Sequence, residues 1–381
     1  MGKSAIFIDS NSIGNFHEVF NAAFFKILEA RFENILYLSS KSSYENLKNI
    51  LVDNDVNSHS NKIEFKEIKV LEGRKSHHIF SRKIYASILL FFLLLKYKNR
   101  DVILANLNEF GTLYFNFISN IFKINLTIIA HGELEYLIQD VPKNKPIFVY
   151  KKLLQRFFKN KISNNIKIIA LGAPIREKLI ELYPKNNGAV VSMEHPYFFK
   201  NVPGEKQFSL PVKMGIVGAI GENKGMLSFI ELSERLKDVI MDKKLELYVI
   251  GKHGYKIENY PLLNFITKAN TIIPSNEYNE AIKELNAILF FYKQNQYQLT
   301  ASGAIFDAIN HEKPVIAIEN NYFNHICSYG KIGYLCEDIN EMESIIRKLI
   351  KHEVSLESVK EFNELKHAFS WENINYPIQD V

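Results

Sequence analysis

Short apolar runs alternate with segments of helical periodicity along most of the chain. Residues 287–318 show this most clearly, because two runs of strand type, 287–291 and 314–318, flank a segment whose apolar residues recur every three or four positions. Those apolar residues are Ala304, Ile305, Ala308 and Ile309. The stretch therefore predicts a strand, a loop, a helix and a second strand.

The same alternation continues on both sides. In the first half the predicted strands are 5–8, 35–38, 63–70, 101–105, 126–130, 166–171 and 190–193, and the predicted helices are 16–30, 79–97, 111–122, 149–161 and 174–182. In the second half the predicted strands are 213–218, 245–250, 287–291 and 314–318, and the predicted helices are 225–241, 276–285, 304–309 and 342–351. This order predicts an α/β fold with two parallel sheets, each flanked by helices.

A polar stretch that contains Pro203, Gly204 and Pro211 separates the two halves and is the best candidate for a linker. We expect an N-terminal domain over residues 1–205 and a C-terminal domain over residues 206–360. Residues 361–381 would form a tail that packs back on the N-terminal domain.

Ligands of parallel sheets bind beyond the carboxyl ends of the strands. Four segments have that position, and two of them come from each half. They are 10–15, 131–135, 218–225 and 300–307. We therefore expect a site in a cleft between the two domains.

Residues 218–225 form a glycine-rich turn between a strand and a helix. Gly218 and Gly221 allow a tight turn and a close approach of the backbone to a ligand, while Lys224 supplies a cation for a phosphate. The spacing fits neither a Walker loop nor a Rossmann fingerprint. The alternative is an ordinary strand-to-helix turn without a ligand.

The helix predicted after Gly303 would present its N-terminus to the same region. Free N–H groups and the helix dipole favour a diphosphate at such a terminus. Thr300 or Ser302 could supply the N-cap hydroxyl, and Asp307 could accept hydrogen bonds from a ribose. The alternative is a crossover helix that Ser302 merely caps.

Composition restricts the choice of function. The chain has 381 residues, 47% of them hydrophobic and 23% charged, which suits two globular domains. Two cysteines in so long a chain suit a reducing compartment. The apolar runs 5–8 and 84–95 are too short for a signal-peptide core and a spanning helix respectively, so we expect no membrane crossing.

The sequence lacks the motifs that are typical of metal sites and of serine hydrolases. His-Glu-x-x-His, clustered Cys and His, and Gly-x-Ser-x-Gly do not occur, and the one Asp-x-Asp, at 53–55, lies in a polar stretch. We therefore expect no metal, no cofactor and no hydrolase elbow.

The second half resembles the donor-binding half of GT-B glycosyltransferases, and most closely the retaining family-4 type. The resemblance covers about residues 212–320, while the first half matches by layout only. It is carried by Gly218, Lys224-Gly225, Ile250-Gly251, Asp307-Ala308 and Lys313-Pro314-Val315. His195-Pro196 is also similar to a His-Pro pair of that family.

The chain departs from this family's pattern at four places. The family's Arg falls on Ala219 and its first Glu on Leu299, while the second Glu falls on Asp307. A family Gly falls on Ser302, next to Gly303. Recognition of the donor sugar would then pass to other polar groups of the same loop, which are Tyr297, Gln298 and Thr300.

The resemblance implies two Rossmann-like domains and roles for named residues. Donor-binding residues would be Gly218, Gly221, Lys224, Gly251, Thr300, Ser302, Gly303 and Asp307. The catalytic residues would be His131, which faces the donor, Glu133 and Lys224, with Glu135 a further acceptor ligand or base. Gly14 and Asn15 would bind the acceptor. The alternative for His131 is a structural histidine at a strand end.

Two segments of the first half combine basic and apolar residues. Lys and Arg beside exposed aromatic side chains suit an anionic membrane surface. For residues 84–95 we favour a core helix, and for residues 149–161 a membrane contact. Nucleic-acid binding is not expected, because no reader motif accompanies the charge.

These features predict a glycosyltransferase that takes a nucleotide-sugar donor and a saccharide or lipid-linked acceptor, in bacterial capsule or lipopolysaccharide synthesis. We expect it in the cytoplasm, at the inner face of the membrane. Two alternatives stay open. One is a nucleotide-sugar epimerase, and the other is a non-catalytic subunit that keeps the GT-B fold.

Overall fold

The computed structural model of the chain describes residues 3–13, 17–54, 63–73, 76–200, 209–292, 297–356 and 361–378. The chain divides into two compact units. Unit 1 comprises Met1–Phe198, Leu299–Ala301 and Phe369–Val381, and unit 2 comprises Phe199–Gln298 and Ser302–Ala368. The chain therefore returns twice to unit 1 after it has left it.

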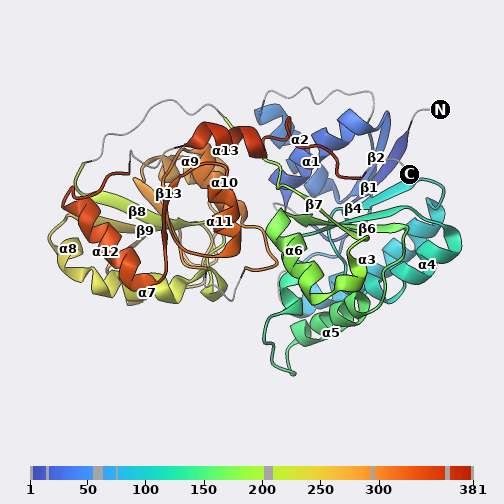
Figure 1. Cartoon of the computed structure of the whole chain (residues 1–381), viewed down its shortest axis with the longest axis horizontal. Coiled ribbons are helices and arrows are strands. Elements are labelled where there is room, and N and C mark those ends of the chain that lie inside the picture. Colours follow the sequence, from blue (N-terminus) through green and yellow to red (C-terminus); the bar gives the residue numbers. More distant parts are fainter. Residues whose placement is uncertain are drawn as a thin grey trace. The chain divides into compact units, whose positions relative to one another are not determined.

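Unit 1 holds a seven-stranded sheet in the order β3-β2-β1-β4-β5-β6-β7 over its described residues, and all neighbouring strands are parallel (Figure 1). The strands are β1 (Ser4–Ile8), β2 (Asn34–Ser39), β3 (Ile63–Glu67), β4 (Asp101–Leu104), β5 (Leu126–Ala130), β6 (Ile166–Leu171) and β7 (Val190–Met193). The helices are α1 (Glu18–Arg31), α2 (Lys41–Asp53), α3 (Ser76–Lys96), α4 (Phe115–Phe122), α5 (Pro146–Lys159) and α6 (Ala173–Leu182), with short 3-10 turns η1 (Gly111–Leu113), η2 (Gly132–Leu137) and η3 (Pro184–Asn186).

Unit 2 holds a six-stranded parallel sheet in the order β10-β9-β8-β11-β12-β13 over its described residues. The strands are β8 (Val212–Val217), β9 (Leu245–Ile250), β10 (Leu263–Phe265), β11 (Ala287–Phe290), β12 (Val315–Ile318) and β13 (Gly333–Cys336). The helices are α7 (Met226–Arg235), α8 (Lys237–Met241), α9 (Ser275–Lys283), α10 (Gly303–Asn310), α11 (Asn321–Cys327), α12 (Ile339–Ile350) and α13 (Phe362–Phe369), with 3-10 turns η4 (Glu222–Lys224) and η5 (Ile257–Asn259).

The central strands are apolar on both faces, as parallel sheets covered by helices require. Every residue of β5 and of β11 is buried. In each sheet the strand order reverses beside the first strand, between β1 and β4 in unit 1 and between β8 and β11 in unit 2. Each sheet thus has one switch point, where the loops after two neighbouring strands lead apart and leave room for a ligand.

The predicted α/β fold with two parallel sheets is confirmed. Some elements differ from the prediction. The helix predicted over 225–241 is two helices that meet at Leu236, and the prediction omitted α2, α11, β10 and β13. These elements are short or mostly polar. In α2, for example, only Ser43, Leu47 and Leu51 are buried.

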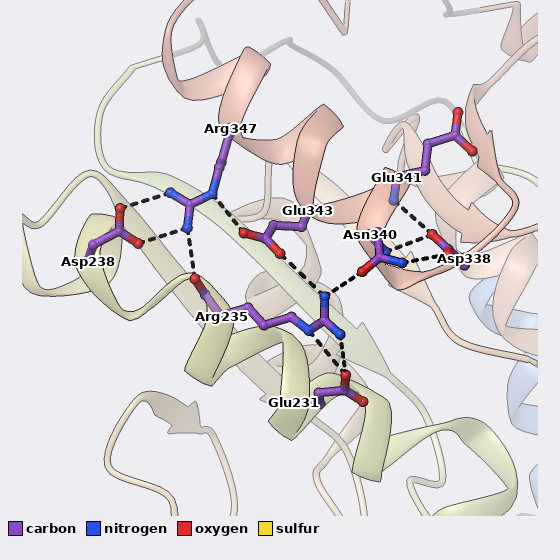
Figure 2. A network of polar contacts seen from close by, with 8 residues as sticks. All are labelled: Glu231, Arg235, Asp238, Asp338, Asn340, Glu341, Glu343 and Arg347. Atoms are coloured by element: carbon purple, nitrogen blue, oxygen red, sulfur yellow. Dashed lines mark hydrogen bonds and ion pairs between the residues drawn. The ribbon is translucent and has the colours of Figure 1, made fainter.

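A network of charged side chains joins α12 to α7 and α8 in unit 2 (Figure 2). The guanidinium of Arg347 donates to Asp238 at 2.8 and 3.0 Å and to Glu343 at 2.9 Å. Arg235 donates to Glu231 on its own helix and to Asn340 on α12. The exposed pairs contribute little individually, so the main role of the network is to orient α12 over the core beneath it.

Helices α3 and α5 contain the two segments of the first half that combine basic and apolar residues. In α5 the aromatic side chains of Tyr150, Phe157 and Phe158 are at most 3% exposed, so they belong to the core and cannot contact a membrane. In α3 the residues facing the protein are buried, but Ile88 and Phe92 lie exposed.

Helix α3 is also, among the described helices, the one with the length and composition of a membrane span. The segment His77–Lys96 has a mean hydropathy of 1.6 and is 28% buried. Core helices of soluble proteins can have the same length and hydropathy, so these two properties do not by themselves show a crossing.

The C-terminal segment packs on unit 1 (Figure 1). The N–H of Tyr197 donates to Phe369 O at 2.9 Å, and Trp371 N–H donates back to Tyr197 O at 3.2 Å. Trp371 and Tyr376 then pack against the hydrophobic cluster that α1 forms with the sheet. Tyr376 also bonds the Thr127 hydroxyl on β5 at 3.2 Å.

Gly251 has no room for a side chain, because its backbone lies directly against that of Gly218. A Cβ on Gly251 would lie 2.0 Å from Gly218 O, and φ is 132°. Glycine adopts such a φ without the penalty that L side chains incur. The two loops after β8 and β9 can therefore touch backbone to backbone.

We predict that Gly251→Ala lowers the free energy of unfolding by roughly 3 kcal/mol, because the methyl group must displace backbone atoms. Urea unfolding measures the change. The control is Gly254→Ala, where the nearest atom to a Cβ is 4.0 Å away. Equal stability of the two variants would contradict the packing described.

Candidate active site

In unit 2 a cation and a phenol gather at the switch point of the sheet. The Nζ of Lys224 lies 3.4 Å from the position that a Cβ on Gly218 would take, and the hydroxyl of Tyr278 lies 3.9 Å from it. Ala304, in the first turn of α10, is also 3.9 Å away. The structure therefore brings the predicted residues Gly218 and Lys224 to the start of the predicted helix.

Asp307 has a partner that the sequence did not indicate. The Tyr278 hydroxyl donates to Asp307 Oδ2 at 2.8 Å, from α9 to α10. This bond fixes the orientation of the Asp307 carboxylate, a group that can accept several hydrogen bonds. Tyr278 went unnoticed because nothing in its local sequence marks it, and its role follows only from the packing of two helices.

Ser302 precedes α10 but does not cap it with its side chain. The hydroxyl lies 3.1 Å from the hydroxyl of buried Tyr292 instead. The prediction that the hydroxyl of Thr300 or Ser302 caps this helix is therefore wrong. The N-terminal N–H groups of α10 carry the positive end of the helix dipole, and they are not covered by this serine.

Two further glycines of the predicted donor site, Gly303 and Gly221, have different surroundings. Gly303, the first residue of α10, is exposed, and a Cβ there would have no atom within 4 Å. Gly221 precedes η4, and its carbonyl accepts the N–H of Lys224 at 3.1 Å. The turn that Gly221 forms thus sets where the lysine leaves the backbone.

In unit 1 three histidine rings lie around Phe20. The ring of His131, directly after β5, stacks on that of His17 at 4.0 Å, and the Phe20 ring meets His131 at 4.6 Å and His195 at 4.9 Å. His131 Nε2 lies 3.1 Å from Ala105 O. Because a carbonyl only accepts, Nε2 carries the proton and Nδ1 of the neutral ring is an acceptor.

Burial keeps this cluster neutral. It lowers the pKa of His131 well below the ordinary value, with further lowering from His17 and His195. It also lowers the pKa of His195 to about 3 and that of His17 to about 4. At neutral pH the rings therefore act as hydrogen-bonding groups and not as cations.

Glu133 lies in a second polar cluster on the other side of the same loop. Its Oε2 accepts the His131 N–H at 2.8 Å. Burial, and then the nearby Glu109, raise the pKa of Glu133 to about 7, and Lys83 opposes the shift. Lys83 itself forms an ion pair with buried Glu109 and lies 4.6 Å from the centre of the Tyr150 ring. A carboxyl group with this pKa can give or take a proton near neutrality.

Glu135 is held by the segment that the chain sends back to unit 1. Its Oε2 accepts the N–H of Leu299 at 2.8 Å and the hydroxyl of Thr300 at 3.3 Å. Leu299 is fully buried. The structure thus joins Thr300, predicted to bind the donor, to Glu135, and it places both in unit 1.

Two predicted residues cannot be placed, because Gly14 and Asn15 lie outside the described residues. Within the described ranges, no group of three or more His, Cys, Asp or Glu side chains could hold a metal ion. The roles assigned to His131, Glu133, Lys224 and the donor loop stay predictions.

Comparison with solved structures identifies the architecture. HepE from Anabaena, solved in complex with UDP-glucose, matches with a TM-score of 0.60 at 12% identity, over 98% of this chain and 96% of that chain. Sucrose-phosphate synthase from Thermosynechococcus elongatus matches with a TM-score of 0.66 at 12% identity, over 97% and 96%. The lipopolysaccharide outer core galactosyltransferase WaaB matches with a TM-score of 0.55 at 15% identity, over 96% and 98%.

The chain has the GT-B fold. No protein-family model matches the chain, and no curated protein does. The resemblance inferred from the sequence is confirmed for the fold, and at these identities the comparison extends no further. The fold alone does not define the function, so the function must be inferred from the residues at the two switch points.

The neutral state of His195 makes stability depend on pH. An unfolded chain binds a proton at this group below pH 6.5, whereas the folded protein does not until about pH 3. Its contribution is therefore constant above pH 6.5, and the free energy of unfolding falls as the pH drops below that value.

We predict that His195→Gln removes about 2 kcal/mol of the stability difference between pH 7.5 and pH 5.0. Urea unfolding at both pH values measures it, with His352→Asn at an exposed position as the control. The same pH dependence in wild type and His195→Gln would contradict the buried, neutral state of this ring.

Proposed function

We propose that this protein is a glycosyltransferase that moves a sugar from a nucleotide-diphosphate sugar to a saccharide acceptor. The observation that carries the proposal is the group at the unit 2 switch point, where Lys224, Gly218 and the start of α10 come together. A cation, an approachable backbone and a helix N-terminus are the features that bind a diphosphate.

Each residue of this group has a role in the proposal. Lys224 and the α10 dipole stabilise the negative charge that develops on the leaving diphosphate. Asp307, oriented by Tyr278, accepts hydrogen bonds from the ribose. Gly218, Gly221, Gly251 and Gly303 keep the path of the diphosphate clear of side chains.

The unit 1 residues would act on the acceptor. In the transfer, the bond between the anomeric carbon and the diphosphate oxygen breaks, and the acceptor oxygen bonds to that carbon and loses its proton. Glu133, with a pKa of about 7, is the proposed recipient of this proton, and His131 would orient the sugar through Nδ1. The sequence predicted that the unit 1 residues and the unit 2 residues act on the same donor and acceptor, and this remains part of the proposal.

The stereochemistry, the donor and the biological role are proposed from the sequence resemblance and from the similar structures. Retention of the anomeric configuration and a hexose donor are proposed from the likeness to the retaining family-4 type. The similarity to WaaB, a lipopolysaccharide outer core galactosyltransferase, supports a role in bacterial surface polysaccharide synthesis. A lipid-linked acceptor is proposed together with that role. Such an acceptor would place the protein at the cytoplasmic face of the membrane.

A non-catalytic subunit is the competing function, because Ala219 and Leu299 replace two polar residues of the family pattern. Leu299 is fully buried, so it offers nothing to a sugar. Release of nucleoside diphosphate from a panel of nucleotide sugars, with and without saccharide acceptors, separates the possibilities. Acceptor-dependent release supports the transferase, and absence of nucleotide binding supports the subunit.

We predict that Lys224→Ala lowers kcat for nucleotide release roughly a hundredfold, because the leaving diphosphate loses its cation. The control is Lys237→Ala, an exposed position at the start of α8. Unchanged turnover in Lys224→Ala would remove the leaving-group role from this lysine.

We predict that kcat/KM rises with pH through about 7, because Glu133 must be ionised to take the acceptor proton. Glu133→Gln keeps an acceptor for the His131 N–H but cannot take a proton, so it should lower the rate roughly a hundredfold and abolish this inflection. Glu181→Gln, on the surface of α6, is the control. A variant that retains the inflection would assign the titration to another group.

A further inference from the structure

Six large apolar side chains lie exposed on two helices and a 3-10 turn of unit 1. They are Ile88 (56% exposed), Phe92 (64%), Leu113 (56%), Phe117 (63%), Ile121 (55%) and Phe122 (37%). The first two belong to α3, Leu113 to η1 and the others to α4. We call this set the α3–α4 apolar face.

The two helices lie side by side and run in the same direction. The Tyr114 hydroxyl, just before α4, donates to Ser87 O in the middle of α3 at 2.5 Å. The rings of Phe91 and Tyr114 are 5.3 Å apart. Lys98, just after α3, lies 5.5 Å from the centre of the Phe122 ring at the end of α4.

These contacts put the exposed side chains on one side of the helix pair. Successive residues of a right-handed helix are rotated by about 100° in the same sense. When two such helices run side by side in the same direction, a residue directly after a contact position in the first helix projects to one side of the pair. A residue directly before a contact position in the second helix projects to that same side. The contact positions are 87 and 91 in α3 and 114, directly before α4. Ile88 and Phe92 therefore share a side with Leu113, Phe117 and Ile121.

Burial agrees with this arrangement. The opposite side of the pair holds Leu90 and Leu94 from α3 and Phe115 and Ser119 from α4, which are all at most 1% exposed. One side of the pair therefore packs on the sheet, and the other presents an apolar surface. Surfaces of this kind mark interaction sites on soluble proteins.

The charge around the α3–α4 apolar face is of one sign. Lys96, Lys98, Arg100 and Lys123 are exposed at the carboxyl ends of the two helices. Residues 76–125 contain six Lys and Arg against two acidic residues, Asp101 and Glu109. Glu109 is fully buried in its pair with Lys83, and Asp101 accepts a hydrogen bond from Asn125. Within residues 76–125 the surface thus combines apolar side chains with four exposed cations, and half-buried Asp101 is the one acidic side chain there that is not fully buried.

We propose that the α3–α4 apolar face docks on an anionic phospholipid bilayer. Its apolar side chains enter the boundary between headgroups and acyl chains, and the four cations contact the lipid phosphates. Helix α3 then lies in the plane of the interface and does not cross the bilayer, since its other side is part of the unit 1 core. This proposal rests on the proposed function, in which the protein lies at the membrane, and it identifies the surface that makes the contact. Membrane binding can be tested without measuring sugar transfer.

Sedimentation with phosphatidylcholine vesicles, with and without phosphatidylglycerol, tests the proposal in the absence of any sugar nucleotide. We expect the full chain to bind the anionic vesicles and to bind neutral ones much more weakly. Phe92→Ser with Phe117→Ser, and separately Lys98→Gln with Arg100→Gln and Lys123→Gln, should each lower binding about tenfold.

Matched controls come from unit 2. Leu227→Ser with Met241→Ser changes side chains that are 59% and 68% exposed, and Lys237→Gln with Lys243→Gln and Lys268→Gln removes the same number of cations. Both controls should bind anionic vesicles like the wild type. Thermal unfolding and turnover with a water-soluble acceptor show separately whether each variant is folded and active.

Three results would overturn the proposal. The first is no binding of the wild-type chain to anionic vesicles, and the second is an equal loss of binding in the unit 2 controls. The third is a wild-type dimer that becomes monomeric in Phe92→Ser with Phe117→Ser while vesicle binding is unchanged, since a second copy would then be what covers this face. Loss of transfer with intact vesicle binding would instead count against the proposed function alone.

Discussion

Parallel pairing of the strands is the constraint on which this structure depends. A parallel strand cannot follow its neighbour through a tight turn, so each connection must cross over the sheet, and the loops after the strands all gather at one edge. Order reversal beside β1 and beside β8 then sends the loops after two paired strands apart, which leaves one gap between loops in each unit. The residues at these gaps are those that the sequence placed directly after strands, among them His131 and Gly218.

The same constraint explains which parts of the sequence could be interpreted. Strands with both faces covered are continuous apolar runs, so the central strands and the α/β class followed from the pattern. Lys224 and Asp307 could be located because they follow strand-to-helix turns. Tyr278 could not, since its meeting with Asp307 depends on how α9 and α10 pack. Hydrophobicity alone also could not separate α5, where Tyr150, Phe157 and Phe158 are buried, from α3 and α4, where Phe92 and Phe117 are exposed.

Leu299 stands where the similar glycosyltransferase pattern has a Glu, and the structure shows what the leucine does instead. A leucine cannot bind a sugar hydroxyl, but its backbone N–H still donates to Glu135, and its side chain is fully buried. The segment from Leu299 to Ala301 therefore serves unit 1, while Ser302 and the helix after it serve unit 2. Leu299 thus belongs to the core of unit 1, and in the proposed function recognition of a donor sugar would fall to the polar residues beside it.

Burial acts in opposite directions on the two titrating groups that share the loop after β5. It disfavours the charged form of both, so it lowers the pKa of His131 and raises that of Glu133. The imidazole is therefore fixed as neutral, while the carboxyl group is brought close to half ionisation at neutral pH. The backbone N–H of His131 donates to Glu133 Oε2, which holds this carboxyl group against the start of the loop, while the imidazole bonds Ala105 O. An acceptor hydroxyl that reached this loop would meet one group that orients it and one that can take its proton, and both properties follow from exclusion of water by the strand end.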